Sequence, residues 1–287
     1  MASRTTALDR LVSEALAIEA ETARDASAIG FVCRAMTLAT LPHRRVEGSH
    51  FERRNGNFTL TLLAPPKVGL PFGAVPRLVL CWLASEAVRT QQREIELGES
   101  MSSFMNELGL VPTGGRWGSI ARLKDQTRRL FSSTVNALYE NGEESAILNQ
   151  TIADKATLWW DPKSPDQAAL WRSTVTLGEQ FYREVIEHPI PVDLRAIQAL
   201  KRSPMAIDAY CWMTYRASYA KKPATIPWQA LAAQFGSDYG RLRDFRAAFI
   251  AEMRKVATVY PAAQFEVTDV GLIVRPSLTH ISRKSSP

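Results

Sequence analysis

Apolar residues recur three and four positions apart along much of the chain, which predicts a mainly helical protein. Residues 6–26 show this spacing clearly, with Leu8, Leu11 and Leu16 among the apolar positions. Glycine, proline and Asn-Gly signals mark where the helices end. The predicted helices cover residues 6–26, 72–92, 101–108, 119–139, 193–200, 204–219, 228–235 and 240–259.

Shorter segments alternate between apolar and polar residues, which is typical of β-strands. The predicted strands are residues 58–63, 94–97, 224–226, 264–268 and 271–275, and the last two read as a β-hairpin. Two longer β-prone runs, residues 146–160 and 173–187, are separated by Asp161-Pro162-Lys163-Ser164-Pro165. Pro189 and Pro191 mark a boundary after the second run.

A short motif occurs twice at comparable places in this order of elements. Arg122-Leu123-Lys124-Asp125 recurs as Arg241-Leu242-Arg243-Asp244, and each copy opens a long helix after a helix that ends at glycine. We therefore predict an internal repeat. Each half has the order of a winged helix, which is a helix-turn-helix followed by a β-hairpin wing. The expected fold class is α+β, mainly helical, with two winged-helix domains in tandem. The expected domains are an N-terminal amphipathic arm at 1–30, winged-helix domain 1 at 31–188 and winged-helix domain 2 at 189–287.

The charge pattern points to a polyanion as partner. Residues 193–287 hold 14 basic and 7 acidic side chains, a net charge of +7, although solubility alone would also account for a modest excess. The helices after the two glycine turns carry basic residues beside their apolar stripes. Arginine can bind guanine, glutamine can bind adenine, and the arginine and lysine cations neutralise phosphates. The candidate DNA-binding residues are Arg116, Arg122, Lys124, Gln126, Arg128 and Arg129 in the first copy, and Arg241, Arg243 and Arg246 in the second. Helical spacing places Arg122, Gln126 and Arg129 on one outward face, and it places Leu242 in the core stripe of the second helix.

Several further residues receive a weaker interpretation. Ser237 and Tyr239 in the turn before the second helix could contact phosphate, and the hairpin offers Arg275 near its end. The aromatic residues Trp159-Trp160, Tyr210, Trp212 and Tyr215 could stack on bases, but such residues more often fill cores, and we interpret them as core.

Several classes of protein are disfavoured by what the sequence lacks. Its 287 residues include three separated cysteines, which is no disulfide framework, and its apolar runs fall short of a membrane span. We find no P-loop, no HExxH and no Gly-x-Ser-x-Gly motif, and the four histidines are not paired at ligand spacing. We therefore expect a cytoplasmic protein that is no enzyme and uses neither metal nor cofactor.

Several motifs together resemble the RepA-type replication initiators of broad-host-range bacterial plasmids. The resemblance spans residues 30–280 and is most specific over 69–131. The motifs are Gly69-Leu70-Pro71-Phe72-Gly73, Pro76-Arg77-Leu78, Glu86-Ala87-Val88-Arg89-Thr90-Gln91, Glu107-Leu108-Gly109, Pro112-Thr113-Gly114-Gly115-Arg116-Trp117-Gly118 and Arg128-Arg129-Leu130-Phe131.

The resemblance implies a function that the residues alone do not give. Such initiators bind repeated sites (iterons) in the double-stranded DNA of a plasmid origin, promote melting of an A·T-rich region and recruit host replication proteins such as a helicase or initiator. Many bind origins as monomers and repress their own promoter as dimers, which controls plasmid copy number. A homodimer, commonly formed through the N-terminal winged helix, is therefore a further candidate partner.

Two other functions stay open at this stage. A winged-helix transcription regulator, including a repressor of its own promoter, would share the DNA-binding features but have no role in replication. An enzyme whose site is assembled from distant residues would leave no local motif. The residues by themselves support a DNA-binding protein with two winged helices.

Overall fold

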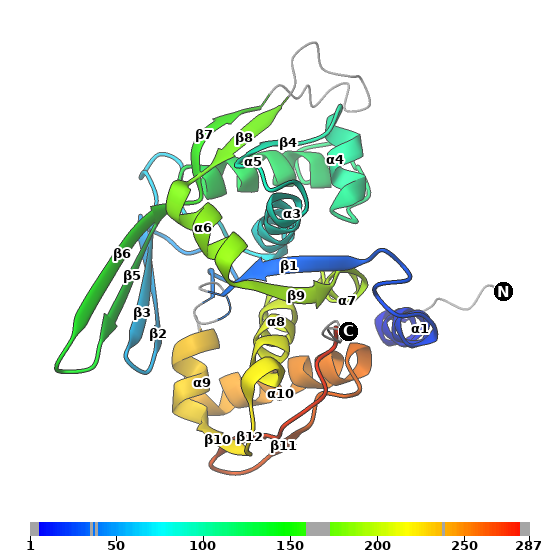
Figure 1. Cartoon of the computed structure of the whole chain (residues 1–287), viewed down its shortest axis with the longest axis vertical. Coiled ribbons are helices and arrows are strands. Elements are labelled where there is room, and N and C mark those ends of the chain that lie inside the picture. Colours follow the sequence, from blue (N-terminus) through cyan, green and yellow to red (C-terminus); the bar gives the residue numbers. More distant parts are fainter. Residues whose placement is uncertain (1–5, 35–36, 38–39, 159–172, 237–238, 282–287) are drawn as a thin grey trace. The chain divides into compact units, whose positions relative to one another are not determined.

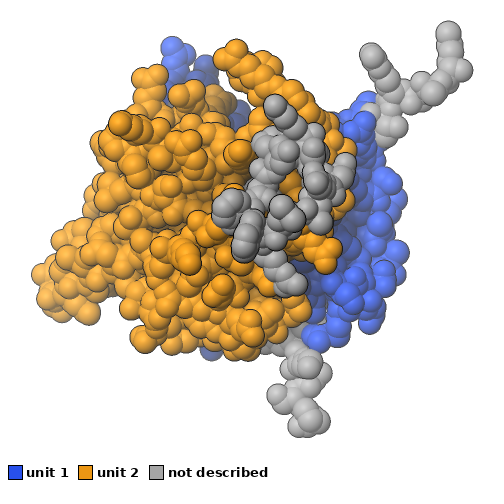
Figure 2. Space-filling view, turned by 90° about the horizontal axis from the view of Figure 1, so that it is seen from above, with its two compact units in different colours: residues 1–32, 190–287 blue, residues 33–189 orange. Residues whose placement is uncertain are grey.

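The structure is a computed structural model that describes residues 6–34, 37, 40–158, 173–236 and 239–281. The chain forms two compact units, coloured separately in Figure 2. Unit 1 comprises residues 1–32 and 190–287, and unit 2 comprises residues 33–189. Among the described helices, none is both long enough and apolar enough to cross a membrane.

Unit 1 joins the N-terminal segment to the C-terminal third of the chain (Figure 1). Strand β1 pairs with β9, and a three-stranded antiparallel sheet has the order β10-β12-β11. Helix α10 packs against α8 and α9. The elements are α1 (Ala7–Ala20), β1 (Ile29–Cys33), β9 (Pro189–Asp193), α7 (Leu194–Ala199), α8 (Pro204–Tyr219), β10 (Ala224–Pro227), α9 (Trp228–Phe235), α10 (Leu242–Val259), β11 (Phe265–Val267) and β12 (Gly271–Val274).

Unit 2 combines two antiparallel sheets with several helices. One sheet has the order β2-β3-β5-β6 and the other β4-β8-β7. Helix α3 packs against both α5 and α6. The elements are β2 (His50–Asn55), β3 (Phe58–Leu63), α3 (Ala74–Thr90), β4 (Glu94–Glu96), α4 (Met101–Glu107), α5 (Ser119–Phe131), β5 (Thr134–Glu140), β6 (Ser145–Thr151), β7 (Ala153–Thr157), β8 (Thr174–Leu177) and α6 (Glu179–Glu187).

Helix α3 supplies much of the unit 2 core. Its residues from Val75 to Cys81 are all buried, since α5 and α6 both cover it. Helix α5 is instead amphipathic, and it buries Leu123 and Leu130 completely. Burial of a leucine side chain contributes about 1.5–3 kcal/mol, so this stripe fixes which face of α5 meets the core.

The predicted helix over 119–139 is wrong beyond Phe131. Residues Thr134–Glu140 form β5, which pairs with β3 on one side and β6 on the other. Thr134 and Val135 are β-branched, and such side chains favour a pleated sheet over a helix. Pairing on both edges therefore outweighs the helical spacing that Thr134 and Leu138 continue in the sequence.

The prediction of β-structure over residues 173–187 is also wrong in part. Only Thr174–Leu177 is a strand, and Glu179–Glu187 forms helix α6. Phe181 and Val185, four residues apart, are the buried positions of α6. That is the spacing of one helical face, which the sequence interpretation missed. The end of the first run and the predicted separator, together residues 159–165, lie outside the described residues.

The N-terminal helix is confirmed over Ala7–Ala20 and stops short of the expected residue 26. The Thr6 hydroxyl accepts a hydrogen bond from the Asp9 backbone N–H, and the Asp9 carboxylate accepts one from the Thr6 N–H. This capping box fixes where the helix begins. Helix α1 packs against α7 and α10, so the segment expected as an arm belongs to unit 1. The division into an arm and two domains at 30/31 and 188/189 otherwise stays a prediction.

Candidate nucleic-acid interface

The loop before α5, residues 110–118, is held in one shape by hydrogen bonds across its base. The Thr113 N–H donates to the Ser119 hydroxyl, and the Ser119 N–H donates to the Thr113 hydroxyl, each at 2.9 Å. The Ser119 hydroxyl also donates to the Val111 carbonyl at 2.7 Å. Gly118 closes the loop so tightly that a Cβ atom there would lie 2.1 Å from the Thr113 carbonyl oxygen. This loop (the Thr113 loop) is therefore a preshaped entry to α5.

Four of the six candidate residues in unit 2 are exposed. Arg116 lies in the Thr113 loop, and Arg122, Lys124 and Arg128 lie on α5. The Arg122 guanidinium donates to the Trp117 carbonyl at 3.3 Å, which ties the helix to the loop. Cations so placed on one helix and its entry loop can neutralise the phosphates of a nucleic acid.

Gln126 was predicted to face outward and does not. Only 2% of the residue is exposed, and its Oε1 accepts a hydrogen bond of 2.8 Å from the Phe72 backbone N–H. Its Nε2 donates to Asp125 at 3.1 Å. The segment 69–73 covers this part of α5, so the amide satisfies a main-chain group instead of reading adenine.

Arg129 is likewise turned inward. Its side chain is 15% exposed, it pairs with Asp125 through a 2.8 Å contact, and it donates to the Leu70 carbonyl at 3.3 Å. Gly69 makes room for it, because a Cβ atom there would lie 2.5 Å from the guanidinium. The predicted outward face of Arg122, Gln126 and Arg129 is therefore wrong for two of its three members.

The second set of candidates, in unit 1, lies at the start of α10. Arg241 is the N-cap residue of α10, and both it and Arg243 are exposed. The Arg243 side chain, 81% exposed, lies 3.6 Å from the Asp244 carboxylate. Arg246 is less available, since it pairs at 3.1 Å with Asp269 in the turn of the β11–β12 hairpin and lies over the Trp228 ring.

Other residues named from the sequence have structural partners. Tyr239 packs edge-on against Phe245, and Arg275 pairs with Glu266 on the neighbouring strand at 2.7 Å. Tyr210 and Trp212 are buried, which confirms the core interpretation. Ser237, a weaker candidate for phosphate contact, and Trp159-Trp160 lie outside the described residues.

The two copies of the repeated motif do not occupy equivalent positions. Arg122 is the fourth residue of α5, whereas Arg241 precedes the first residue of α10. Leu123 is consequently fully buried, while Leu242, predicted as core, is 40% exposed. The motif therefore does not mark the same contact surface twice.

Trp117 is the exposed residue that sequence reasoning did not single out. It is 81% exposed at the tip of the Thr113 loop, and the Arg116 guanidinium lies 5.2 Å from its ring centroid. The sequence did carry a signal, because a tryptophan between Gly115-Arg116 and Gly118 has no apolar neighbours to take it into a core.

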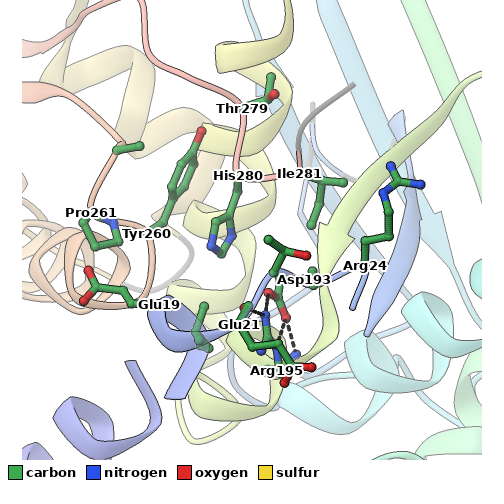
Figure 3. Close-up of a pocket in the computed structure, with 14 residues that line it drawn as sticks. Glu19, Glu21, Arg24, Asp193, Arg195, Tyr260, Pro261, Thr279, His280 and Ile281 are labelled. Atoms are coloured by element: carbon green, nitrogen blue, oxygen red, sulfur yellow. Dashed lines mark hydrogen bonds and ion pairs between the residues drawn. The ribbon is translucent and has the colours of Figure 1, made fainter. Parts of the chain in front are cut away.

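A separate cavity of about 440 Å³ opens in unit 1 between the end of α1, α7 and residues 279–281 (Figure 3). The Tyr210 hydroxyl accepts from the Asp193 N–H at 2.9 Å and lies 2.7 Å from His280 Nδ1. Burial raises the pKa of Tyr210 well above its usual value, so the hydroxyl stays protonated. Burial also lowers the pKa of His280, and the nearby Arg195 adds to this against the opposing effect of Asp193. This network holds the C-terminal segment on α8, and none of the nine candidate DNA-binding residues lies in it.

No group of histidine, cysteine and acidic side chains suited to a metal ion occurs in the part of the chain that the structure describes. The candidate interface consists of the exposed arginine and lysine side chains, the Thr113 loop and the exposed ring of Trp117.

Comparison with solved structures places this fold beside domains of RctB. The structure titled "Crystal structure of SeMet derivatives of domain2 and domain 3 of RctB" matches with a TM-score of 0.53 and 8% identity, over 83% of this chain and 85% of that chain. A second structure of RctB domains 2-3, residues 155–483, gives 0.49 and 8%, over 84% and 96%. The first match shows a shared fold. No curated protein sequence matches the chain.

Sequence comparison then gives the family. Residues 70–229 match the family described as "Plasmid encoded RepA protein", and this stretch is more than half of the chain. The protein therefore belongs to the family of plasmid-encoded RepA proteins, as the motifs of residues 69–131 indicated.

Proposed function

We propose that this protein initiates plasmid replication by binding repeated double-stranded sites at the origin. The family match over residues 70–229 is the observation that carries the proposal. Origin melting and recruitment of a host helicase or initiator follow from that role, and homodimers would repress the protein's own promoter and so limit copy number. The proposal assigns the chain no catalytic step.

Each unit contributes one winged helix in this proposal. In unit 1 the order α8, β10, α9, α10, β11, β12 supports it, together with a sheet in which β12 lies between β10 and β11. In unit 2 the corresponding order is α3, β4, α4, α5, β7, β8, and β8 lies between β4 and β7. The β5–β6 hairpin is an insertion after α5. The second long helix of each motif, α5 or α10, is the one that would enter a major groove.

The α5 side supplies the stronger contact surface. Arg116, Arg122, Lys124 and Arg128 are exposed there, and Asp125, the one acidic residue among them, is paired with Arg129. In unit 1, Arg241 and Arg243 would add contacts at the start of α10. Phosphate contacts position the protein, and base contacts supply the sequence preference.

Origin binding is tested by titrating the full chain with duplex DNA from the flanking plasmid region at several salt concentrations. The Arg122→Ala/Arg128→Ala variant should lower the slope of log affinity against log salt by about 0.9 for each phosphate that it no longer neutralises. The matched control is Lys221→Ala/Lys222→Ala, which removes the same charge from an exposed turn after α8. Equal reductions in both variants would contradict an α5 contact surface.

A transformation test separates replication from transcriptional control. The protein is supplied in trans to a plasmid that carries only the candidate origin. Maintenance of that plasmid is the expected result. Duplex binding and promoter repression without any maintenance would identify a transcription regulator instead.

A further inference from the structure

Trp117 stands out because no packing accounts for its position. At 81% it is more exposed than any other large hydrophobic residue in the described ranges, whereas Trp212 and Trp228 are 2% and 3% exposed. A tryptophan buries a large apolar surface when it packs, so leaving the ring in water gives up stabilisation that a core position would provide.

The Thr113 loop holds the ring outward. The reciprocal Thr113–Ser119 hydrogen bonds close the base of the loop, and the Gly118 N–H donates to the Gly115 carbonyl at 3.1 Å. The Trp117 carbonyl is fixed by Arg122. None of these hydrogen bonds uses the indole, so the loop positions the ring and does not need it for its own stability.

The surroundings of the ring are cationic. From Leu110 to Lys124 the chain contains Arg116, Arg122 and Lys124 and no acidic residue. The Arg116 guanidinium lies over the indole at 5.2 Å, as in a cation–π contact, and this leaves the opposite face for another flat group. A phosphate backbone beside the cations would bring its bases within reach of that face.

We propose that the indole of Trp117 stacks on an unpaired base of single-stranded DNA. This inference rests on the proposed origin-binding function and adds a second DNA form to it. In a duplex, both faces of a base are covered by its neighbours, whereas a base in a separated strand offers a free face. Arg116 and Arg122 would hold the phosphates on either side while Trp117 holds the base.

The charge argues for nucleic acid over a protein partner. A protein seated on this loop would have to offer acidic groups and a flat apolar pocket together. A single strand offers regularly spaced phosphates and flat rings at every nucleotide, and stacking of this kind tolerates any base.

The test uses the full chain with a fluorescently labelled oligothymidine and, in parallel, the origin duplex. Trp117→Ala should weaken oligothymidine binding about 5- to 150-fold, the range expected when one base is no longer stacked. Trp117→Phe should keep most of the affinity because it keeps an aromatic face. Trp117→Leu should behave like the alanine variant. Val111→Ala is the matched control, since Val111 is 76% exposed in the same loop without a flat ring.

Intrinsic fluorescence gives a second readout. The chain has seven tryptophans, so the quenching by oligothymidine that is present in the wild type and absent from Trp117→Phe isolates this ring. Circular dichroism and thermal unfolding should be the same for all four variants, because the exposed ring is not packed in a core.

The outcomes separate the two proposals. Duplex binding together with single-strand binding that depends on an aromatic residue at 117 supports both. Duplex binding with single-strand affinity unchanged in Trp117→Ala overturns the stacking site alone. The exposed indole would then be a contact for a protein partner. Equal weakening of duplex and single-strand binding in Trp117→Ala also overturns it. Failure of the wild type to bind the duplex overturns the proposed function itself.

Discussion

Helices α5 and α10 follow turns at corresponding places in their units, but they present different surfaces. On α5, Arg122, Lys124 and Arg128 are exposed, and a stiff loop adds Arg116. On α10, Arg246 is held by the hairpin residue Asp269, and Arg243 lies beside Asp244. Yet the net charge of +7 belongs to the part of the chain that contains α10. Net charge along a sequence therefore does not show which exposed cations are engaged by neighbouring carboxylates.

The largest expected difference is in the free energy of unfolding, between variants of the leucines in the two motif copies. Leu123→Ala should lower the free energy of unfolding by about 2–5 kcal/mol, because it leaves a cavity in a closed core. Leu242→Ala should cost about 1 kcal/mol or less, since the residue is 40% exposed. Urea unfolding of both variants measures the difference. Similar destabilisation at the two sites would mean that the motif copies are equivalent after all.

A smaller difference in stability is expected between Arg129→Ala and Arg122→Ala, two variants within α5. Arg129→Ala should cost about 1–3 kcal/mol of stability, because it unpairs Asp125 and removes the hydrogen bond to the Leu70 carbonyl. Arg122→Ala should change stability by no more than about 0.5 kcal/mol. Its effect should appear in the salt dependence of duplex binding. A stable Arg129→Ala protein with impaired DNA binding would reverse these assignments.

The smallest effect is a dependence on pH that is confined to unit 1. The pKa of His280 is lowered from 6.5 by burial, so below pH 6.5 the unfolded chain takes up the proton before the folded chain does. Folding stability contributed by this site is therefore constant above pH 6.5 and decreases as pH falls from 6.5 toward the lowered pKa. Protonation of His280 also places a hydrogen on Nδ1, so this nitrogen can then only donate to the Tyr210 hydroxyl.

Amide hydrogen exchange, corrected for intrinsic rates, measures this effect separately in the two units. Protection of α8 should fall relative to protection of α3 as the pH is lowered below 6.5. His280→Gln offers a neutral partner to Tyr210 and should remove that difference. An identical pH response of α3 and α8 in the wild type would place the sensitive group elsewhere.

Much of the fold could be predicted, because local pattern and tertiary packing agree over most elements. Helices α3, α8 and α9 and strand β3 begin and end within two residues of the predicted bounds. Prediction failed at Thr134–Glu140 and at Glu179–Glu187. In the first, pairing with two strands distant in sequence overrides a continuing helical pattern. In the second, a two-residue apolar signal was too short to oppose β-prone neighbours.

The candidate site was predicted less completely, for two different reasons. Gln126 and Arg129 were placed outside by helical spacing alone, whereas the covering segment 69–73 comes from 54 or more residues earlier in the chain. A helical wheel contains no information on which partner lies over which face. Trp117 was missed because tryptophan is normally assigned to a core, although its polar and glycine neighbours in the Thr113 loop were a signal against that assignment.

Only Ser132 and Ser133 separate the end of α5 from the start of β5, and the Ser133 hydroxyl also donates to the Arg129 carbonyl. Strand β5 is fixed on both edges by β3 and β6. The helix that carries the exposed cations therefore has no hinge of its own. A displacement of the sheet would therefore shift the helix, and its cations, with it.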